Sequence, residues 1–150
     1  MEEKLTTELD KILENTRPEQ LSQYLDRNRS HLADEKRGFY YFMANTLAEK
    51  NIRMKDVFSF AGVSESYGSK IISMEKHTRQ RDLILRLCIA GHFTLQEINR
   101  ALKLYGVSEL YARDPRDACI IVAVNNRIYD LGRIDELLEE QGFEKLSKTE

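Results

Sequence analysis

The 150-residue sequence contains few of the residues that turns and cross-links require. It has two prolines, seven glycines, two cysteines and no tryptophan. An all-β protein of this length needs more turn residues, because its many short strands are joined by turns. Leu, Glu, Lys, Arg, Ala and Gln are plentiful instead, and these residues favour helix. The composition therefore predicts an all-α protein whose core is large enough to be stable without disulfides or metals.

The sequence has only two cysteines, and both lie in short apolar stretches. It also has no long apolar run. Neither Cys88 nor Cys119 has a second Cys or His at the spacing of a metal site, so we expect free, buried thiols. A disulfide between them stays open as an alternative. The first ten residues are too charged for a secretory signal, and no apolar run approaches the ~20 residues that cross a bilayer. We therefore expect a cytoplasmic protein that does not enter the membrane.

The sequence also lacks a recognisable catalytic arrangement. His31, His77 and His92 are scattered, with no carboxylate or cysteine at a spacing that would build a metal or catalytic site. There is no glycine loop for phosphates and no nucleophile pattern. We expect that the protein is not an enzyme and that it needs no cofactor and no metal.

Charge is distributed unevenly along the chain. Residues 1–35 carry five Lys/Arg against nine Asp/Glu, residues 36–106 carry twelve against six, and residues 107–150 carry six against ten. The net charges are therefore −4, +6 and −4. A basic middle between acidic flanks is typical of a polyanion-binding unit. Solvated helix faces are the alternative explanation of the same pattern.

Two segments near the start, 4–14 and 18–29, have apolar residues at helical spacing. These residues are Leu5, Leu9, Ile12, Leu13, Leu21, Tyr24 and Leu25. Pro18 is acceptable in a first helical turn. We expect a helical hairpin within residues 1–35.

Residues 36–106 are predicted to form five helices, at about 38–50, 54–61, 64–74, 80–90 and 94–105. Gly62 can adopt the positive φ of a tight corner, Val63 would fill that corner, and Ser64 can cap the third helix. Thr94 and Glu97 match a capping box at the start of the fifth helix. Tyr40 and Tyr41 are adjacent, so we expect one in the core and one exposed.

Residues 107–150 are predicted to form a pair of helices. The apolar run 118–124 fits either a buried strand or a buried helix, but Asp114 and Pro115 are start signals for a helix. We expect the apolar side chains of this helix to belong to the core more than to a dimer interface. A last helix is expected at about 131–141, with Gly142 after its end.

The segment VFSFAGVSESYGSKI, within residues 57–71, resembles the lambda-repressor-like helix-turn-helix family, also called the Xre family. Ala61, Gly62, Val63 and Ser64 match the end of that family's second helix. The resemblance implies a five-helix unit flanked by the hairpin and the C-terminal pair. Nearly the whole chain from residue 5 onward also resembles a group of helix-turn-helix proteins from anaerobic Gram-positive bacteria, which implies an architecture but no activity.

The resemblance implies that the third helix enters the DNA major groove. The residues that it places against bases are Ser64, Glu65, Ser66, Tyr67 and Lys70. The residues that it places against phosphates are Ser69, Lys76, His77, Arg79 and Arg81. For the loop after the helix, a solvated stretch is the alternative, and Arg81 with Asp82 could instead cap the fourth helix.

Four positions depart from the family's pattern. Met54 stands where glutamine is common, Gly68 where an apolar residue is usual, Met74 where glycine is frequent, and Thr78 near a common proline. Glu65 is acidic at a leading position, where it could accept a hydrogen bond from cytosine but would repel phosphates.

The leading hypothesis is a sequence-specific transcriptional regulator that binds double-stranded DNA as a homodimer, with the C-terminal helices as dimer surface. The alternative is a protein-interaction adaptor that keeps the scaffold without binding DNA. A third possibility is that the acidic ends cover the basic face until a signal releases them.

Overall fold

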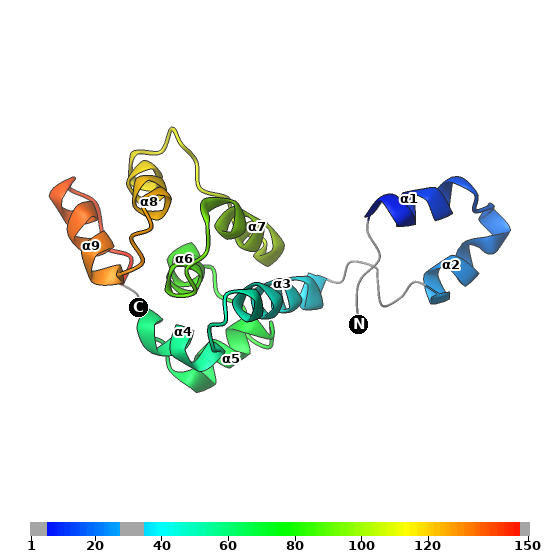
Figure 1. Ribbon diagram of the computed structural model, residues 1–150, viewed down its shortest axis with the longest axis horizontal. Coiled ribbons are helices and arrows are strands. Elements are labelled where there is room, and N and C mark those ends of the chain that lie inside the picture. The colour runs from blue at the N-terminus through cyan, green and yellow to red at the C-terminus, as the bar shows by residue number, and fades with distance from the viewer. Residues whose placement is uncertain (1–5, 28–34, 148–150) are drawn as a thin grey trace. The chain divides into compact units, whose positions relative to one another are not determined.

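The computed structural model describes residues 6–27 and 35–147, and every regular element within these ranges is a helix. The predicted all-α class is therefore confirmed for the described part of the chain. Leu5 and His31 lie outside it. The chain divides into two compact units, residues 1–34 (the N-terminal unit) and residues 35–150 (the main unit), as Figure 1 shows.

The N-terminal unit contains two short helices. They are α1 (Thr6–Glu14) and α2 (Leu21–Arg27), with a 3₁₀ turn, η1 (Pro18–Gln20), before α2. Tyr24 is buried, but four apolar side chains stay 37–49% exposed: Ile12, Leu13, Leu21 and Leu25. The predicted helices are present, and they leave most of their apolar stripe in contact with solvent.

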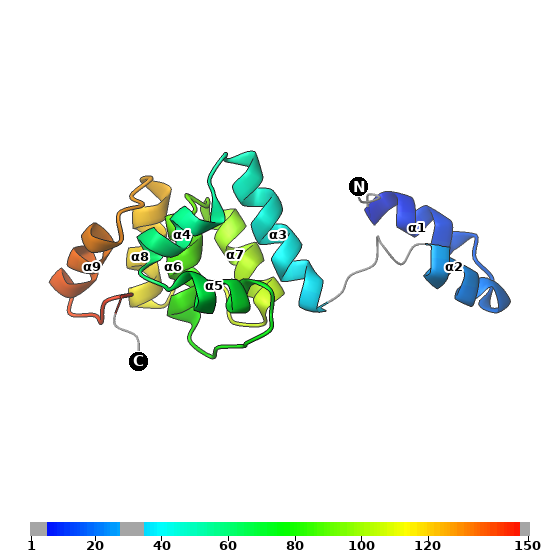
Figure 2. The same cartoon turned by 90° about the horizontal axis from the view of Figure 1, so that it is seen from below.

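Seven helices form the described part of the main unit. They are α3 (Glu35–Glu49), α4 (Met54–Ala61), α5 (Glu65–Ile72), α6 (Arg81–Ala90), α7 (Leu95–Tyr105), α8 (Pro115–Asn125) and α9 (Leu131–Glu140). One continuous apolar core runs from Phe39 to Leu146. Helix α6 lies in its middle, with every residue from 83 to 90 buried, and packs against α4, α7 and α9 (Figures 1 and 2).

The helix starts follow the capping signals in the sequence. The Thr94 hydroxyl accepts from the Glu97 amide at 3.2 Å, and the Glu97 carboxylate accepts from the Thr94 amide at 2.9 Å. Asp114 caps α8 by accepting from the Asp117 amide at 3.0 Å. The predicted capping box and the choice of helix over strand for residues 118–124 are both confirmed.

The prediction for Tyr40 and Tyr41 is wrong, because both side chains are exposed, by 41% and 44%. Phe39 and Met43, four residues apart, occupy the inner face of α3. This leaves Tyr40 at the flank and Tyr41 on the outer side. The two rings pack edge to face against each other instead, with 5.5 Å between their centroids.

Two ion pairs, the crossed Arg–Asp pairs, join the first turn of α6 to the first turn of α8. Arg81 donates through both terminal nitrogens to Asp117, one of these bonds being 3.1 Å long, and Arg116 donates to Asp82 at 3.0 and 2.8 Å. Such two-pronged guanidinium–carboxylate contacts are directional as well as charged. They hold the C-terminal helix pair against the helices before it.

The apolar run of α8 is mostly core, as expected. Ile120, Ala123 and Val124 are buried, whereas Val122 is 60% exposed. On α9, buried Asp135 accepts from two groups that follow the helix, the Leu146 amide at 2.8 Å and the Ser147 hydroxyl at 2.5 Å. The last described residues are thereby fixed to the same unit. Within residues 6–27 and 35–147, no helix combines the length and apolarity needed to span a bilayer.

Candidate nucleic-acid interface

A tight corner joins α4 to α5. Gly62 has a φ of 71°, and the amides of Gly62 and Val63 turn back to the last carbonyls of α4, with Val63 donating to Phe58 at 2.9 Å. Val63 is half-buried against the core. The Ser64 hydroxyl accepts from the Tyr67 amide at 3.2 Å and so begins α5. The three roles predicted for Gly62, Val63 and Ser64 are confirmed by this geometry.

One side of α5 faces solvent, and the other is anchored in the core. Four of its predicted contact residues are exposed: Ser64, Glu65, Ser66 and Ser69. Tyr67 and Lys70 are half-buried, and Ile71 and Ile72 are buried. In Figure 2, α5 lies in front of the other helices of the main unit. Within the main unit, the exposed end of α5 is therefore accessible to a binding partner.

The loop after α5 has a defined shape. Met74 adopts a left-handed φ of 66°, which explains why glycine would suit this position. The Lys76 amide then donates to the Lys70 carbonyl at 3.0 Å. This bond turns the chain back along the end of α5, so Lys76 lies next to the helix that carries Lys70.

Tyr105, on α7, holds the same loop from the inside. Its hydroxyl accepts from the Thr78 amide at 2.7 Å, a bond that proline at position 78 could not make. The His77 ring stacks on the Tyr105 ring at 4.5 Å between centroids and 14° between planes. Burial raises the pKa of Tyr105, so its hydroxyl stays protonated. No local pattern in the sequence indicates this contact between Tyr105 and the loop.

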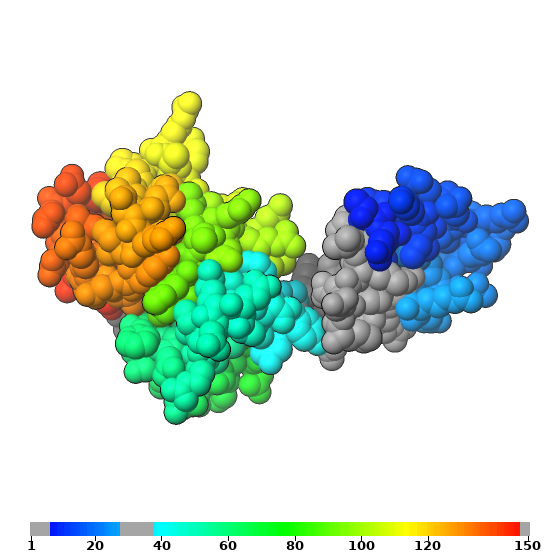
Figure 3. Space-filling view, in the orientation of Figure 1, coloured from blue at the N-terminus to red at the C-terminus, as the bar shows by residue number. Residues whose placement is uncertain are grey.

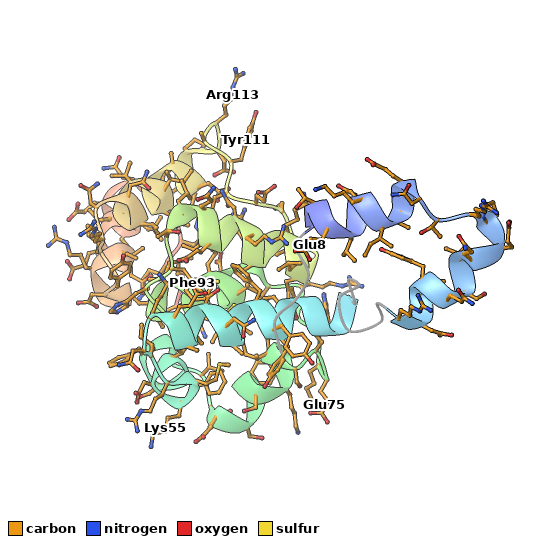
Figure 4. All side chains as sticks on the ribbon, turned by 45° about the vertical axis from the view of Figure 1, so that its right-hand side comes forward. Glu8, Lys55, Glu75, Phe93, Tyr111 and Arg113 are labelled. Carbon is orange, nitrogen blue, oxygen red and sulfur yellow. The ribbon has the colours of Figure 1, made fainter. Side chains whose placement is uncertain are left out.

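Several cations of α4, α5 and the loop after α5 have no carboxylate partner in the described ranges. Lys55, Lys70 and Arg79 form no ion pair there, and the Lys76 ammonium lies 6.0 Å from the centre of the Tyr67 ring. Two exposed carboxylates, those of Glu65 and Glu75, are also on this side. Figure 4 shows Lys55 and Glu75 pointing away from the body of the unit. The surface therefore carries a small excess of positive charge.

Arg81 differs from the other predicted phosphate contacts. Besides Asp117, its guanidinium donates to the Ser108 and Glu109 carbonyls at 3.4 and 3.2 Å. Asp117 is 2% exposed as a residue and also accepts from the Tyr111 amide. Arg81 is therefore not expected to contact phosphate, because its donors are used to join α6 to α8. His77, Ser69, Lys76 and Arg79 remain exposed.

The described residues give little support for metal binding or for thiol chemistry. They contain no group of three or more His, Cys, Asp or Glu that could hold a metal ion. Both cysteines are free thiols, with Cys88 buried and Cys119 half-buried. Burial raises the pKa of the Cys88 thiol well above its ordinary value, which keeps it protonated.

Comparison of the chain with models of known families, with curated proteins and with solved structures finds no match.

The loop between α7 and α8 projects from the main unit, as the space-filling view in Figure 3 shows. Tyr111 and Arg113 lie at its tip (Figure 4), and Tyr111 is 60% exposed. Sequence reasoning did not single out this projection.

Proposed function

We propose that the protein is a sequence-specific, DNA-binding transcriptional regulator of the helix-turn-helix type, acting in the cytoplasm and inserting α5 into the major groove. The observation that carries the proposal is the exposed, capped first turn of α5, which follows directly on a tight corner. A major groove about 12 Å wide admits one helix, and its base edges meet residues near the helix start. Ser64, Glu65, Ser66 and Ser69 have the exposure that such contacts need.

The side chains on this surface divide into two roles. Ser66, Tyr67 and Lys70 contact base edges, and the Glu65 carboxylate accepts from the amino group of cytosine. Lys76 and Arg79 contact phosphates, because both are exposed in the loop after α5 and neither has a carboxylate partner among the described residues. Phosphate contacts supply most of the non-specific affinity, whereas base contacts supply the sequence preference.

A homodimer follows from the small size of the reading surface. One short helix contacts too few base pairs for useful discrimination, so two copies would bind paired half-sites. The 60% exposed Val122 on α8 is an apolar residue on the expected dimer surface. Light scattering with and without DNA tests this: a strict monomer in both cases removes the dimer.

The main experiment combines binding-site selection from random duplexes with mobility shifts at several salt concentrations. Lys70→Ala is expected to weaken binding to the selected site by about tenfold and to leave random duplex nearly unchanged, since one base contact is worth roughly 1–3 kcal/mol. Arg79→Ala is expected to weaken every sequence and to lower the salt slope by about 1. Arg100→Ala, at an exposed arginine on α7 and outside the expected dimer surface, is the matched control. Absence of duplex binding at low salt ends the proposal.

A second candidate function, a protein-interaction adaptor without DNA affinity, is favoured by exposed apolar side chains. Phe60 on α4 is 72% exposed, and the N-terminal unit exposes apolar residues on both of its helices. Surfaces of this kind often bind other proteins. One stoichiometric protein partner in a pull-down, together with absent DNA binding, would select the adaptor.

A further inference from the structure

We propose that the contact between the Phe58 ring and Gly68 sets the tilt of α5 and thereby determines which bases it meets. The inference rests on the proposed function and adds two positioning residues that do not themselves touch DNA. Helices α4 and α5 approach each other closely at one point.

Gly68 lies under the ring of Phe58. A Cβ atom added at residue 68 would be 2.5 Å from Cδ1, 2.6 Å from Cε1 and 2.9 Å from Cγ of that ring. Carbon atoms in ordinary contact are about 3.5–4.0 Å apart, so any side chain at residue 68 must displace the ring or the helix by about 1 Å. The ring is 3% exposed and fully surrounded, so it has little room to turn away.

Phe58 also takes part in the corner at the end of α4. Its carbonyl accepts from the Val63 amide at 2.9 Å, which closes the corner before α5. The same residue therefore fixes the start of the turn through its backbone and the spacing of the next helix through its side chain. Further along α5, Ile71 and Ile72 are anchored in the core. With α5 anchored at its far end, the size of the side chain at position 58 sets how α5 tilts.

The exposed side chains of α5 would move with that tilt. Hydrogen bonds to base edges tolerate only a few tenths of an ångström around about 2.9 Å, so a displacement near 1 Å misaligns them. Phosphate contacts from flexible lysine and arginine side chains adjust more readily. A change at this contact should therefore reduce sequence preference more than total affinity.

The experiment uses the full chain with three variants: Gly68→Ala, Phe58→Leu and the double variant Phe58→Leu/Gly68→Ala. The ratio of affinities for the selected site and for random duplex is the readout. Gly38→Ala is the matched control, because a Cβ at this helical glycine would meet Leu104 at an ordinary 3.6 Å. Circular dichroism establishes that each variant is folded.

We expect Gly68→Ala to lower the ratio about tenfold, the effect of losing one base contact, with random-duplex affinity within about threefold. The double variant should recover most of the ratio, because leucine can turn away from the added methyl, and Gly38→Ala should keep it. A folded Gly68→Ala with the wild-type ratio overturns the proposal. If Gly68→Ala does not fold, the double variant must exceed Phe58→Leu in ratio, and an equal or lower value overturns it.

A structural readout separates this inference from the proposed function. Residual dipolar couplings measure the orientation of α5 amides relative to α3 and α7 without DNA. Phe58→Leu should reorient α5, and the double variant should restore its orientation. If the wild-type chain binds no duplex, the proposed function fails; an unchanged α5 orientation in Phe58→Leu overturns the tilt mechanism itself.

Discussion

The surface around α5 and the junction between α6 and α8 use cationic side chains in opposite ways. At the junction, Arg81 and Arg116 are held by carboxylates of the same unit. Around α5, Lys70 and Arg79 have no ion pair within the described ranges. Arg79 and Arg81 are two residues apart and looked alike in the sequence. A buried carboxylate partner, more than residue type or local spacing, therefore decides whether a cationic side chain stabilises the fold or is available for binding.

The largest expected effect is at the junction. Asp117→Ala removes both the Arg81 pair and the bond from the Tyr111 amide, at a side chain that is 4% exposed. Breaking a buried pair typically costs 3–5 kcal/mol, so we expect the free energy of unfolding to fall by about 3 kcal/mol. Urea denaturation measures it. Asp56→Ala is the control, because its pair with Arg53 is exposed and should contribute less than about 1 kcal/mol.

The two neighbouring arginines provide a sharper test. Arg81→Ala is expected to lower the free energy of unfolding by about 2 kcal/mol, because it leaves the Asp117 carboxylate buried without its cation. Arg79→Ala should change it by less than about 0.5 kcal/mol, as exposed positions usually do. Equal losses of stability for the two variants would contradict the division between a stability region and a binding region.

Tyr105 lies between the two regions, because it joins the core to the loop that carries Lys76 and Arg79. Tyr105→Phe removes the acceptor of the buried Thr78 amide and is expected to cost about 1–2 kcal/mol. It should also speed amide hydrogen exchange at Thr78, measured by NMR. Tyr41→Phe, at an exposed ring, is the control and should leave both quantities unchanged. Unaltered exchange at Thr78 in Tyr105→Phe would show that this bond does not hold the loop.

The smallest expected effect concerns pH. Burial raises the pKa of Glu97, but the hydrogen bonds from Lys50 and Thr94 and the charge of Lys50 outweigh it, so the pKa falls below its ordinary value of 4.5. A carboxyl with a lowered pKa stabilises the fold above its unfolded value and loses that contribution as the pH falls through the folded value. Unfolding midpoints in acid should therefore depend less on pH in Glu97→Gln than in the wild type. Glu49→Gln is the control, and a dependence equal to that of the wild type in Glu97→Gln would refute the assignment.

Local signals predicted most helix ends. Gly62 and Ser64 specify the corner before α5, and Thr94 with Glu97 specifies the start of α7, because each signal acts within a few residues. Long-range contacts were not predictable in this way. Arg81 meets a carboxylate 36 residues away, and Gly68 is required by a ring on another helix. One of Tyr40 and Tyr41 was wrongly predicted to lie in the core, because Phe39 and Met43 already occupy the inner face of α3.

The crossed Arg–Asp pairs impose a condition on how this sequence could diverge. The same dipeptide, Arg-Asp, occurs at residues 81–82 and at residues 116–117, and each arginine pairs with the aspartate of the other dipeptide. A single replacement by an uncharged residue at any of the four positions leaves one charge without its partner, whereas a matched change in both members of a pair need not. Related chains that share this junction are therefore expected to exchange residues there two at a time, and such correlated changes would mark the junction even in sequences whose other residues have drifted apart.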